Sequence, residues 1–284
     1  MQGQQTHRST TPAASRRRRL FGRLTVAAGI LVVGASVASA LLPSEAPAPA
    51  GPSEKKVLFV YGGWPGHEPV PCRDVFVPWL ESLGWDVTVS DSQDVYADKA
   101  LMGSLDLVVQ VWTMDTIGKE NLAGLLEAVR GGVGIAGWHG GLGDSYRQET
   151  EYQFMVGGQW VAHPGNVIDY TVEITDKDDP ITAGLSNFEM HSEQYYMHVD
   201  PNSTVLATTT FSGKHAPWID KATMPVVWKK VYGKGRVFYN SLGHDPAVFD
   251  IEEALTMMQR GILWASESRH VETPDLVAPA YPGK

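Results

Sequence analysis

Histidine and acidic residues recur in this sequence at points where a run of apolar residues has just ended. Gly66-His67-Glu68 follows one such run, and Trp138-His139-Gly140-Gly141 follows another. His163-Pro164, the segment from His191 to Tyr196, and Gly243-His244-Asp245 supply three further positions. One histidine alone is more often a hydrogen-bonded structural residue, but several at equivalent positions predict a shared cleft. The glycines beside them predict tight turns or a close approach of a ligand to the backbone.

Imidazoles together with one carboxylate are ligands that suit zinc or a similar divalent ion. The candidate metal ligands are His67, His139, Glu193 and His244. Three or four such ligands leave a position on the ion open for water. A second interpretation needs no metal, because His139 and Glu193 can also act as general base and general acid. The candidate catalytic residues are therefore His139, Glu193 and His244.

Aromatic and polar side chains near these positions favour a sugar as the ligand. Indole rings cover the apolar face of a sugar ring, and carboxylates bind pairs of hydroxyl groups. The candidate substrate-binding residues are Trp138, Asp144, Tyr146, Trp160, His163 and Tyr195.

The elements that must hold these residues alternate between strand and helix. Continuous apolar runs, typical of strands buried on both faces, cover 57–61, 105–112 and 133–138, and a shorter strand covers 85–89. Apolar residues at helical spacing predict helices around 76–83 and 122–129. This alternation predicts an α/β, flavodoxin-like, doubly wound fold with a mostly parallel sheet and helices on both faces. Ligands of such sheets bind beyond the carboxyl ends of the strands, which here means 62–67 and 139–146.

The second half of the chain is richer in β-structure. Strands are predicted at 167–174 and 204–211, and a hairpin is predicted over 225–240 with its turn at Gly233-Lys234-Gly235. A final helix is expected after Asp250, where Glu253 completes a capping-box pattern.

Three glycines, Gly132, Gly134 and Gly137, match the dinucleotide-binding pattern G-x-G-x-x-G by letter. That pattern requires a loop that follows a strand and opens a helix, whereas here a helix precedes the glycines and they lie within the strand. We therefore expect no nucleotide cofactor. Glycines inside a strand instead predict close packing of a helix against the sheet.

The first 40 residues are typical of an export signal. Arg16 to Arg19 precede an apolar run from Leu24 to Leu42, and Ala38-Ser39-Ala40 gives a cleavage pattern. Arg18-Arg19-Leu20-Phe21 resembles a twin-arginine signal; the alternatives are an ordinary secretory signal and an uncleaved anchor. We predict a signal peptide over 1–40, a Pro/Ala-rich linker over 41–54, a folded domain over 55–266 and an extended tail over 267–284. The mature protein is then periplasmic or extracellular, with no membrane association after cleavage.

The charge of the chain is unevenly distributed. Residues 1–40 contain six of the 23 basic residues and no acidic residue, so the remainder carries 17 basic and 32 acidic residues, a formal charge of −15. A domain with this much negative charge repels the phosphate backbone, so we expect no nucleic-acid partner. The single cysteine, Cys72, excludes an internal disulfide and a cysteine-rich zinc site.

Several motifs resemble those of the trehalose-utilisation (ThuA-like) family. They are Gly-Trp-His139-Gly-Gly with Gly-Asp144-Ser-Tyr146, Val156-Gly-Gly-Gln-Trp160 with His163-Pro164, Met190-His191-Ser-Glu193-Gln-Tyr195-Tyr, Gly235-Arg-Val-Phe-Tyr-Asn-Ser-Leu-Gly-His244-Asp and Arg260-Gly-Ile-Leu-Trp264-Ala. The resemblance covers about Lys55 to Ala265. Ser192 stands where the family pattern has an acidic residue.

That family resembles class I glutamine amidotransferases in fold, in which a cysteine after a central strand attacks an amide. The corresponding turn here carries Trp138-His139-Gly140-Gly141, and Cys72 lies after the first strand instead. No G-x-S-x-G motif offers a serine as a substitute. We therefore expect no glutaminase activity through a thioester.

The resemblance also implies a ligand, namely a glucoside or a 3-keto-sugar. It leaves three functions open: a metal-dependent or His/Glu-dependent isomerase, lyase or hydrolase, a carbohydrate-binding protein without catalysis, and an accessory subunit of a secreted sugar oxidoreductase. The expected partners are a small sugar and, in the third case, that oxidoreductase.

Overall fold

The computed structural model describes residues 54–273, which belong to one compact unit. The predicted signal segment 1–40, all but the last residue of the linker 41–54, and 274–284 of the predicted tail lie outside the described residues. Within 54–273, no helix is long and apolar enough to cross a membrane. The tail begins with a turn rather than in an extended form, because Glu267 O accepts a hydrogen bond from His270 N.

In the first half of the described chain, strands and helices alternate as predicted. In the second half, most elements are strands. The strands are β1 (Lys56–Gly63), β2 (Asp86–Ser90), β3 (Leu107–Thr113), β4 (Gly134–Trp138), β5 (Gly158–Ala162), β6 (Val167–Ile174), β7 (Phe188–Glu193), β8 (Tyr196–Val199), β9 (Thr204–Thr210), β10 (Thr223–Tyr232) and β11 (Gly235–Asn240). The α-helices are α1 (Pro69–Ser82), α2 (Lys99–Ser104), α3 (Lys119–Arg130), α4 (His139–Gly143), α5 (Thr150–Val156) and α6 (Glu252–Ser266). Short 3₁₀ turns are η1 (Pro65–His67), η2 (Gln93–Ala97), η3 (Pro217–Ile219) and η4 (Pro246–Asp250).

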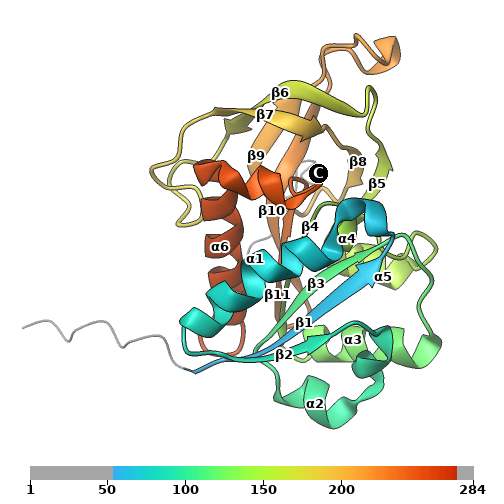
Figure 1. The fold of residues 1–284 in the computed structure, drawn as a ribbon, viewed down its shortest axis with the longest axis vertical. Coiled ribbons are helices and arrows are strands. Elements are labelled where there is room, and N and C mark those ends of the chain that lie inside the picture. The colour runs from blue at the N-terminus through green and yellow to red at the C-terminus, as the bar shows by residue number, and fades with distance from the viewer. Residues whose placement is uncertain (1–53, 274–284) are drawn as a thin grey trace, which may run out of the picture. The chain divides into compact units, whose positions relative to one another are not determined.

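Nine strands form one mixed sheet in the order β2-β1-β3-β4-β11-β10-β9-β6-β7, and β5 and β8 form a separate two-stranded ribbon. The first five strands in that order are parallel, and the remaining pairings are antiparallel. In Figure 1, β6 and β7 form the upper part of the ribbon diagram, with the parallel strands below them. This confirms the predicted α/β, flavodoxin-like fold with additional strands in the C-terminal half.

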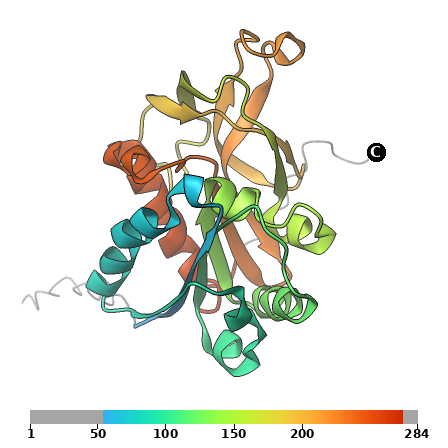
Figure 2. The same ribbon diagram turned by 45° about the vertical axis from the view of Figure 1, so that its right-hand side comes forward.

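Helices cover both faces of the parallel strands (Figures 1 and 2). Alternate residues of β1 explain why: Val57 and Phe59 pack with α1 and α6, while Leu58 and Val60 pack with α3 on the other face. All four side chains are fully buried. A strand that is buried on both faces cannot alternate apolar with polar residues, which is why its sequence is a continuous apolar run.

The glycines of β4 allow a helix to approach the sheet, as the sequence predicted. A Cβ atom on Gly134 would lie 2.0 Å from the carbonyl oxygen of Ala265 in α6. A Cβ atom on Gly137 would lie 2.5 Å from the carbonyl oxygen of Gln110 in β3. Both obstructing atoms are backbone atoms, so neither can move aside at small cost.

Two local predictions were wrong. The capping box at Asp250 and Glu253 does not form, because Asp250 ends η4 and Ile251 is the N-terminal cap of α6, without a side-chain hydrogen bond. The hairpin turn is shorter than predicted, since Gly235 is already the first residue of β11 and pairs with Tyr232.

We predict that Gly134→Ala lowers the free energy of unfolding by about 1–3 kcal/mol, because overpacking against a fixed backbone forces α6 away from the sheet. Gly103→Ala is the matched control, since a Cβ atom there meets nothing within 4 Å and the residue lies in α2. Alanine at that helical position should be neutral or slightly stabilising. Urea unfolding of both variants measures the difference; equal midpoints would contradict the packing argument.

Candidate functional site

Four of the predicted site residues bring their side chains together beyond the carboxyl ends of the parallel strands. His67 ends η1 after β1, His139 directly follows β4, and His244 follows β11. Glu193 is the last residue of β7, the strand at the opposite end of the sheet order from β2. One nitrogen or oxygen atom from each of these four residues lies within 4.8 Å of the other three. We call this group the His₃Glu cluster.

The distances from Glu193 to the three histidines are close to those between two ligands of one ion. Glu193 Oε2 lies 3.1 Å from His139 Nε2, 3.4 Å from His244 Nδ1 and 3.7 Å from His67 Nε2. Around a tetrahedral ion with bonds of about 2.0–2.1 Å, two ligand atoms lie about 3.3 Å apart. The three measured separations lie on both sides of that value.

Hydrogen bonds from outside the cluster hold two of the rings. Nδ1 of His139 lies 2.8 Å from the carbonyl oxygen of Ser241. A carbonyl oxygen can only accept, so Nδ1 carries the proton and Nε2 of the neutral ring presents a lone pair. Nδ1 of His67 pairs with the hydroxyl of Thr113 at 3.0 Å. Such outer partners fix ring orientation in metal sites.

The protonation of the cluster follows from its burial. Burial lowers the pKa of His139 to about 3, although the neighbouring Glu193 carboxylate acts in the opposite direction. Burial alone would raise the pKa of Glu193, but the imidazoles of His139, His244 and His67 around its carboxylate outweigh burial and hold that pKa well below its usual range. The Glu193 carboxylate in turn raises the pKa of His244. At neutral pH, His139 is therefore neutral and Glu193 is ionised.

These protonation states leave two acceptors facing each other. The lone pair of His139 Nε2 and the ionised Glu193 oxygen are 3.1 Å apart, with no proton of their own to share. A proton or a cation between them removes this repulsion, and burial disfavours the proton. The donor set, neutral imidazoles with one carboxylate, therefore fits a divalent cation such as zinc.

Left-handed backbone conformations surround the cluster. His139 has φ of +48°, Met114 directly after β3 has +47°, and Glu68 after η1 has +46°. Such conformations cost non-glycine residues roughly 1–3 kcal/mol each and are typical of functional sites. Gly140 is needed for the same close arrangement, because a Cβ atom there would lie 2.5 Å from the His67 ring. The glycine beside His139 thus admits a neighbouring histidine.

The rim of the cluster contains a further histidine and two tryptophans. Nε2 of His163 lies 3.6 Å from Glu193 Oε1, and its side chain is 29% exposed. The Trp160 ring lies 5.6 Å from that of His163, and the Arg147 guanidinium covers the Trp160 ring at 4.5 Å. Trp64, 43% exposed, packs edge-on against His67. The buried atoms Trp160 Nε1 and His163 Nδ1 have no hydrogen-bond partner among residues 54–273.

Tyr195 lies within the site, but it faces a cluster residue. Its ring stacks on His139 with centroids 3.9 Å apart and is only 3% exposed. It holds the imidazole plane in place and offers a ligand little surface.

Three of the predicted sugar-binding residues have other surroundings. Trp138 is 1% exposed and packs against Phe76 and Phe249 in the core. Tyr146 is equally buried and packs against Tyr152. The sugar-binding interpretation of these two residues is therefore wrong, since neither side chain can reach a ligand. Both Asp144 carboxylate oxygens are bound by Arg147, at 2.5 and 2.7 Å, so Asp144 orients the arginine.

Sequence reasoning missed Thr113, Ser241, Arg147 and Trp64. Thr113 carried a signal, because it is a polar residue at the end of an otherwise apolar strand. Ser241 carried none, since it contributes a main-chain carbonyl that any residue has. Arg147 stands three residues after Asp144 and directly follows the nominated segment 139–146.

Cys72 is chemically inert in this fold. It lies in α1, fully buried, and burial raises the pKa of its thiol to about 12. The reactive thiolate is therefore not formed near neutral pH. The strand-end position that would carry a nucleophile is occupied by His139.

We predict that the advantage in stability of the unmodified protein over His139→Asn shrinks as the pH falls from 7 to 5 in the presence of a chelator. The pKa of His139 is about 3 in the folded state and 6.5 as the ordinary value, so below 6.5 the unfolded state binds the extra proton. Stability then falls by up to about 1.4 kcal/mol per pH unit. Asparagine tolerates the left-handed backbone. Urea unfolding at each pH measures the difference, and a pH-independent difference would contradict a buried neutral imidazole.

Solved structures share this fold at low sequence identity. A structure described as a ThuA-like protein from Bacteroides uniformis is 16% identical, with a TM-score of 0.65 over 83% of this chain and 99% of that one. A second, from Parabacteroides merdae, is 20% identical, with a TM-score of 0.60 over 78% and 93%. A cytoplasmic protein of Salmonella typhimurium is 15% identical, with a TM-score of 0.52 over 77% and 100%. At these identities the similarity concerns the fold. Among curated proteins, none matches the chain.

The sequence also matches a family model across nearly all of the described domain. That model, described as trehalose utilisation, covers residues 56–265 and therefore includes every residue of the His₃Glu cluster and its rim. The predicted family resemblance is thus confirmed, and the chain belongs to the trehalose-utilisation (ThuA-like) family.

Proposed function

We propose that the His₃Glu cluster binds one divalent cation, zinc or a similar ion, and that the protein acts there on a glucoside or a 3-keto-sugar. Membership of the family supports a function related to trehalose utilisation. The observation that carries the proposal is the contact of two acceptors, His139 Nε2 and Glu193 Oε2, 3.1 Å apart in a buried site. The same contact disfavours metal-free acid–base catalysis by His139, because its free nitrogen is already in contact with Glu193.

The rim supports a sugar ligand. Trp160 offers a half-buried indole ring. His163, whose side chain is 29% exposed, lies between that ring and Glu193. Trp64 is in contact with another cluster residue, His67, so two of the residues around Glu193 have an indole ring beside them. Aromatic faces combined with hydrogen-bonding groups are suited to pyranose rings.

The reaction that we propose begins with loss of a proton from the carbon next to the 3-keto group. The electron pair of that C–H bond forms the carbon–carbon double bond of an enediolate. Return of the proton at the neighbouring carbon gives isomerisation, and breakage of the glycosidic C–O bond, with protonation of the leaving oxygen, gives elimination. A bound cation would supply Lewis-acid polarisation of the carbonyl oxygen. We assign Glu193 Oε1 and His163, which face each other at 3.6 Å, to accept and return the proton.

We further propose that the protein acts outside the cytoplasm, alongside a sugar oxidoreductase that forms the keto group. The support for export is the sequence of residues 1–40, with its arginines and apolar run. Replacing Arg18 and Arg19 by lysine should retain the protein in the cytoplasm of its host if the twin-arginine route is used. Unchanged export would favour the ordinary secretory route.

We predict that the protein binds one divalent ion and that His139→Asn or Glu193→Gln abolishes stoichiometric binding. Thr113→Val should weaken binding about 10–100-fold, because it removes the partner that orients His67. His191→Asn is the matched control, since this histidine is 70% exposed on β7 and pairs with Asp169. Elemental analysis and calorimetric zinc titration measure both effects. A metal-free protein that does not bind added zinc would contradict the proposal.

We predict that the zinc-loaded protein catalyses exchange of the hydrogen next to the keto group of 3-keto-trehalose in heavy water. Proton NMR follows this exchange and any released glucose. His163→Asn leaves the four proposed ligands in place and should reduce the rate by at least about 100-fold, as expected for loss of a positioned proton-transfer group. Zinc binding together with unchanged 3-keto-trehalose would contradict the enzymatic proposal. Sugar binding without turnover would then identify a binding protein, and co-purification with an oxidoreductase an accessory subunit.

A further inference from the structure

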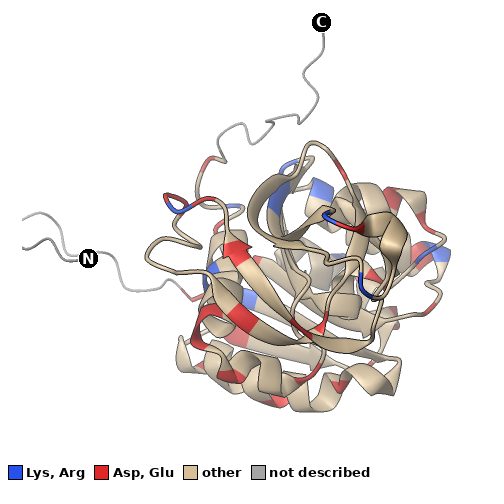
Figure 3. Ribbon diagram, turned by 90° about the horizontal axis from the view of Figure 1, so that it is seen from above, with Lys and Arg blue, Asp and Glu red and all other residues tan. Residues whose placement is uncertain are grey.

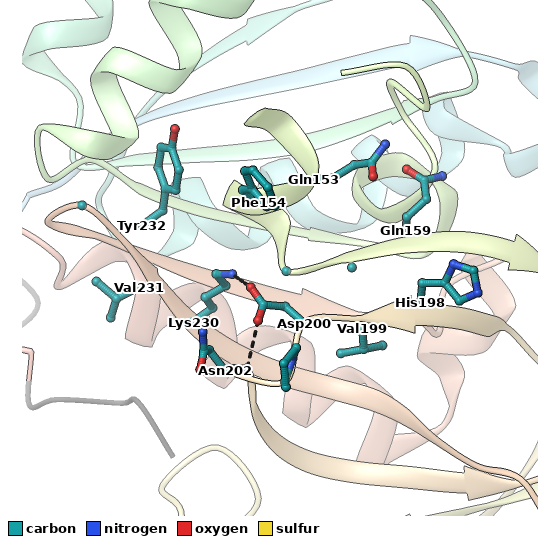
Figure 4. A pocket seen from close by; sticks show the side chains of 14 residues that line it. Gln153, Phe154, Gln159, His198, Val199, Asp200, Asn202, Lys230, Val231 and Tyr232 are labelled. Atoms are coloured by element: carbon teal, nitrogen blue, oxygen red, sulfur yellow. Dashed lines mark hydrogen bonds and ion pairs between the residues drawn. The ribbon is translucent and has the colours of Figure 1, made fainter. Parts of the chain in front are cut away.

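A groove of about 770 Å³ lies apart from the His₃Glu cluster and shares no residue with it. It is formed by the end of α5, the start of β5, the end of β8, the turn at 200–202 and the last residues of β10 (Figure 4). This volume is within the range of sites for small molecules. Nothing in the proposed function uses it.

The groove presents one exposed aromatic ring among polar side chains. Phe154 is 55% exposed, so its ring is open to a ligand in the groove. Gln153 and Gln159 donate their amide hydrogens to the main-chain oxygens of Arg147 and Trp160, so their amide oxygens remain available as acceptors. The exposed His198 adds a ring whose nitrogens make no hydrogen bond within the described residues. Figure 4 shows Gln153, Gln159 and His198 toward one end of the groove, with Gln153 between Phe154 and the other two.

The charges of the groove cancel. Lys230 forms an ion pair with Asp200 along the wall, and Arg130 beside Tyr232 lies 3.8 Å from Glu151. Figure 3 shows acidic residues spread over helices and strands in the view from above. A phosphate or carboxylate ligand would therefore meet no uncompensated positive charge. The ligand that fits is uncharged, rich in hydroxyl groups, and has an apolar face for Phe154.

We propose that this groove is a second saccharide-binding site, which takes a neutral oligosaccharide. The proposal does not depend on a metal ion or on catalysis at the cluster. The aromatic ring stacks on a pyranose face, and the amide oxygens of Gln153 and Gln159 and the ring of His198 bind its hydroxyl groups.

The β5–β8 ribbon separates the groove from the rim of the His₃Glu cluster. Gln159 pairs with His198, and the next pair along the ribbon is Trp160 with Met197. Side chains alternate between faces, so the first pair lines the groove and the second points toward the cluster. Gln153 and Gln159 also hold the main chain of Arg147 and Trp160, the two rim residues that stack on each other. A saccharide in the groove thus contacts the same short segments that shape the rim.

Calorimetric titration of the full chain in chelator, with trehalose, maltotriose and cellotriose as probes, tests this site. We expect at least one probe to bind, Phe154→Ala and His198→Ala each to weaken it about tenfold, and His139→Asn to leave it unchanged. Trp218→Ala is the matched control, because this tryptophan is 85% exposed and lies outside the groove. Both groove residues are exposed, so these variants should fold.

Two outcomes would overturn the proposal. One is that none of the three probes binds at concentrations up to about 10 mM, a weak limit for a specific site. The other is that binding survives Phe154→Ala and His198→Ala but is lost in His139→Asn, which would locate the sugar at the cluster. Failure of zinc binding has no bearing on either result, so the two proposals fail separately.

Discussion

The meeting of an ionised carboxylate with the lone pair of a neutral imidazole is the constraint on which this site depends. Glu193 and His139 are acceptors at hydrogen-bond distance, each fixed from behind: His139 by the Ser241 carbonyl, and Glu193 by its place at the end of β7. Proteins tolerate such a contact where a cation resolves it, because the penalty for a buried unpaired charge is otherwise several kcal/mol. The glycines, the left-handed backbone and the stacked Tyr195 around it all serve to hold this arrangement.

Two different parts of the fold contribute side chains to the site. The parallel strands and their two helical layers supply a rigid edge from which His67, His139 and His244 project. The antiparallel strands and the β5–β8 ribbon supply Glu193, His163 and Trp160. Neither half carries a complete site, so the chemistry belongs to their junction. The turn directly after β4 carries His139 and no cysteine.

Much of the fold could be predicted because a strand that is buried on both faces is a continuous apolar run in the sequence, as in β1 and β3. The four cluster residues could be nominated because strand ends converge in a doubly wound sheet, whatever separates them along the chain. Side-chain direction could not be predicted in the same way. Trp138 precedes His139 directly, yet as the last residue of β4 it points into the core. Thr113 and Ser241 were missed because they act through a hydroxyl and a main-chain carbonyl that support other residues.

The origin of Glu193 in the edge strand β7 has a consequence for how the chain folds. The cluster joins residues from position 67 to position 244, and its contacts are among the most distant along the chain. Such contacts form late, because the entropy of closing long loops must be overcome before they contribute. The cluster can therefore be assembled only after β7 has docked. An ion bound there would link β7 to the parallel strands and would slow the release of β7 during unfolding. The rate of unfolding would then depend on the concentration of that ion.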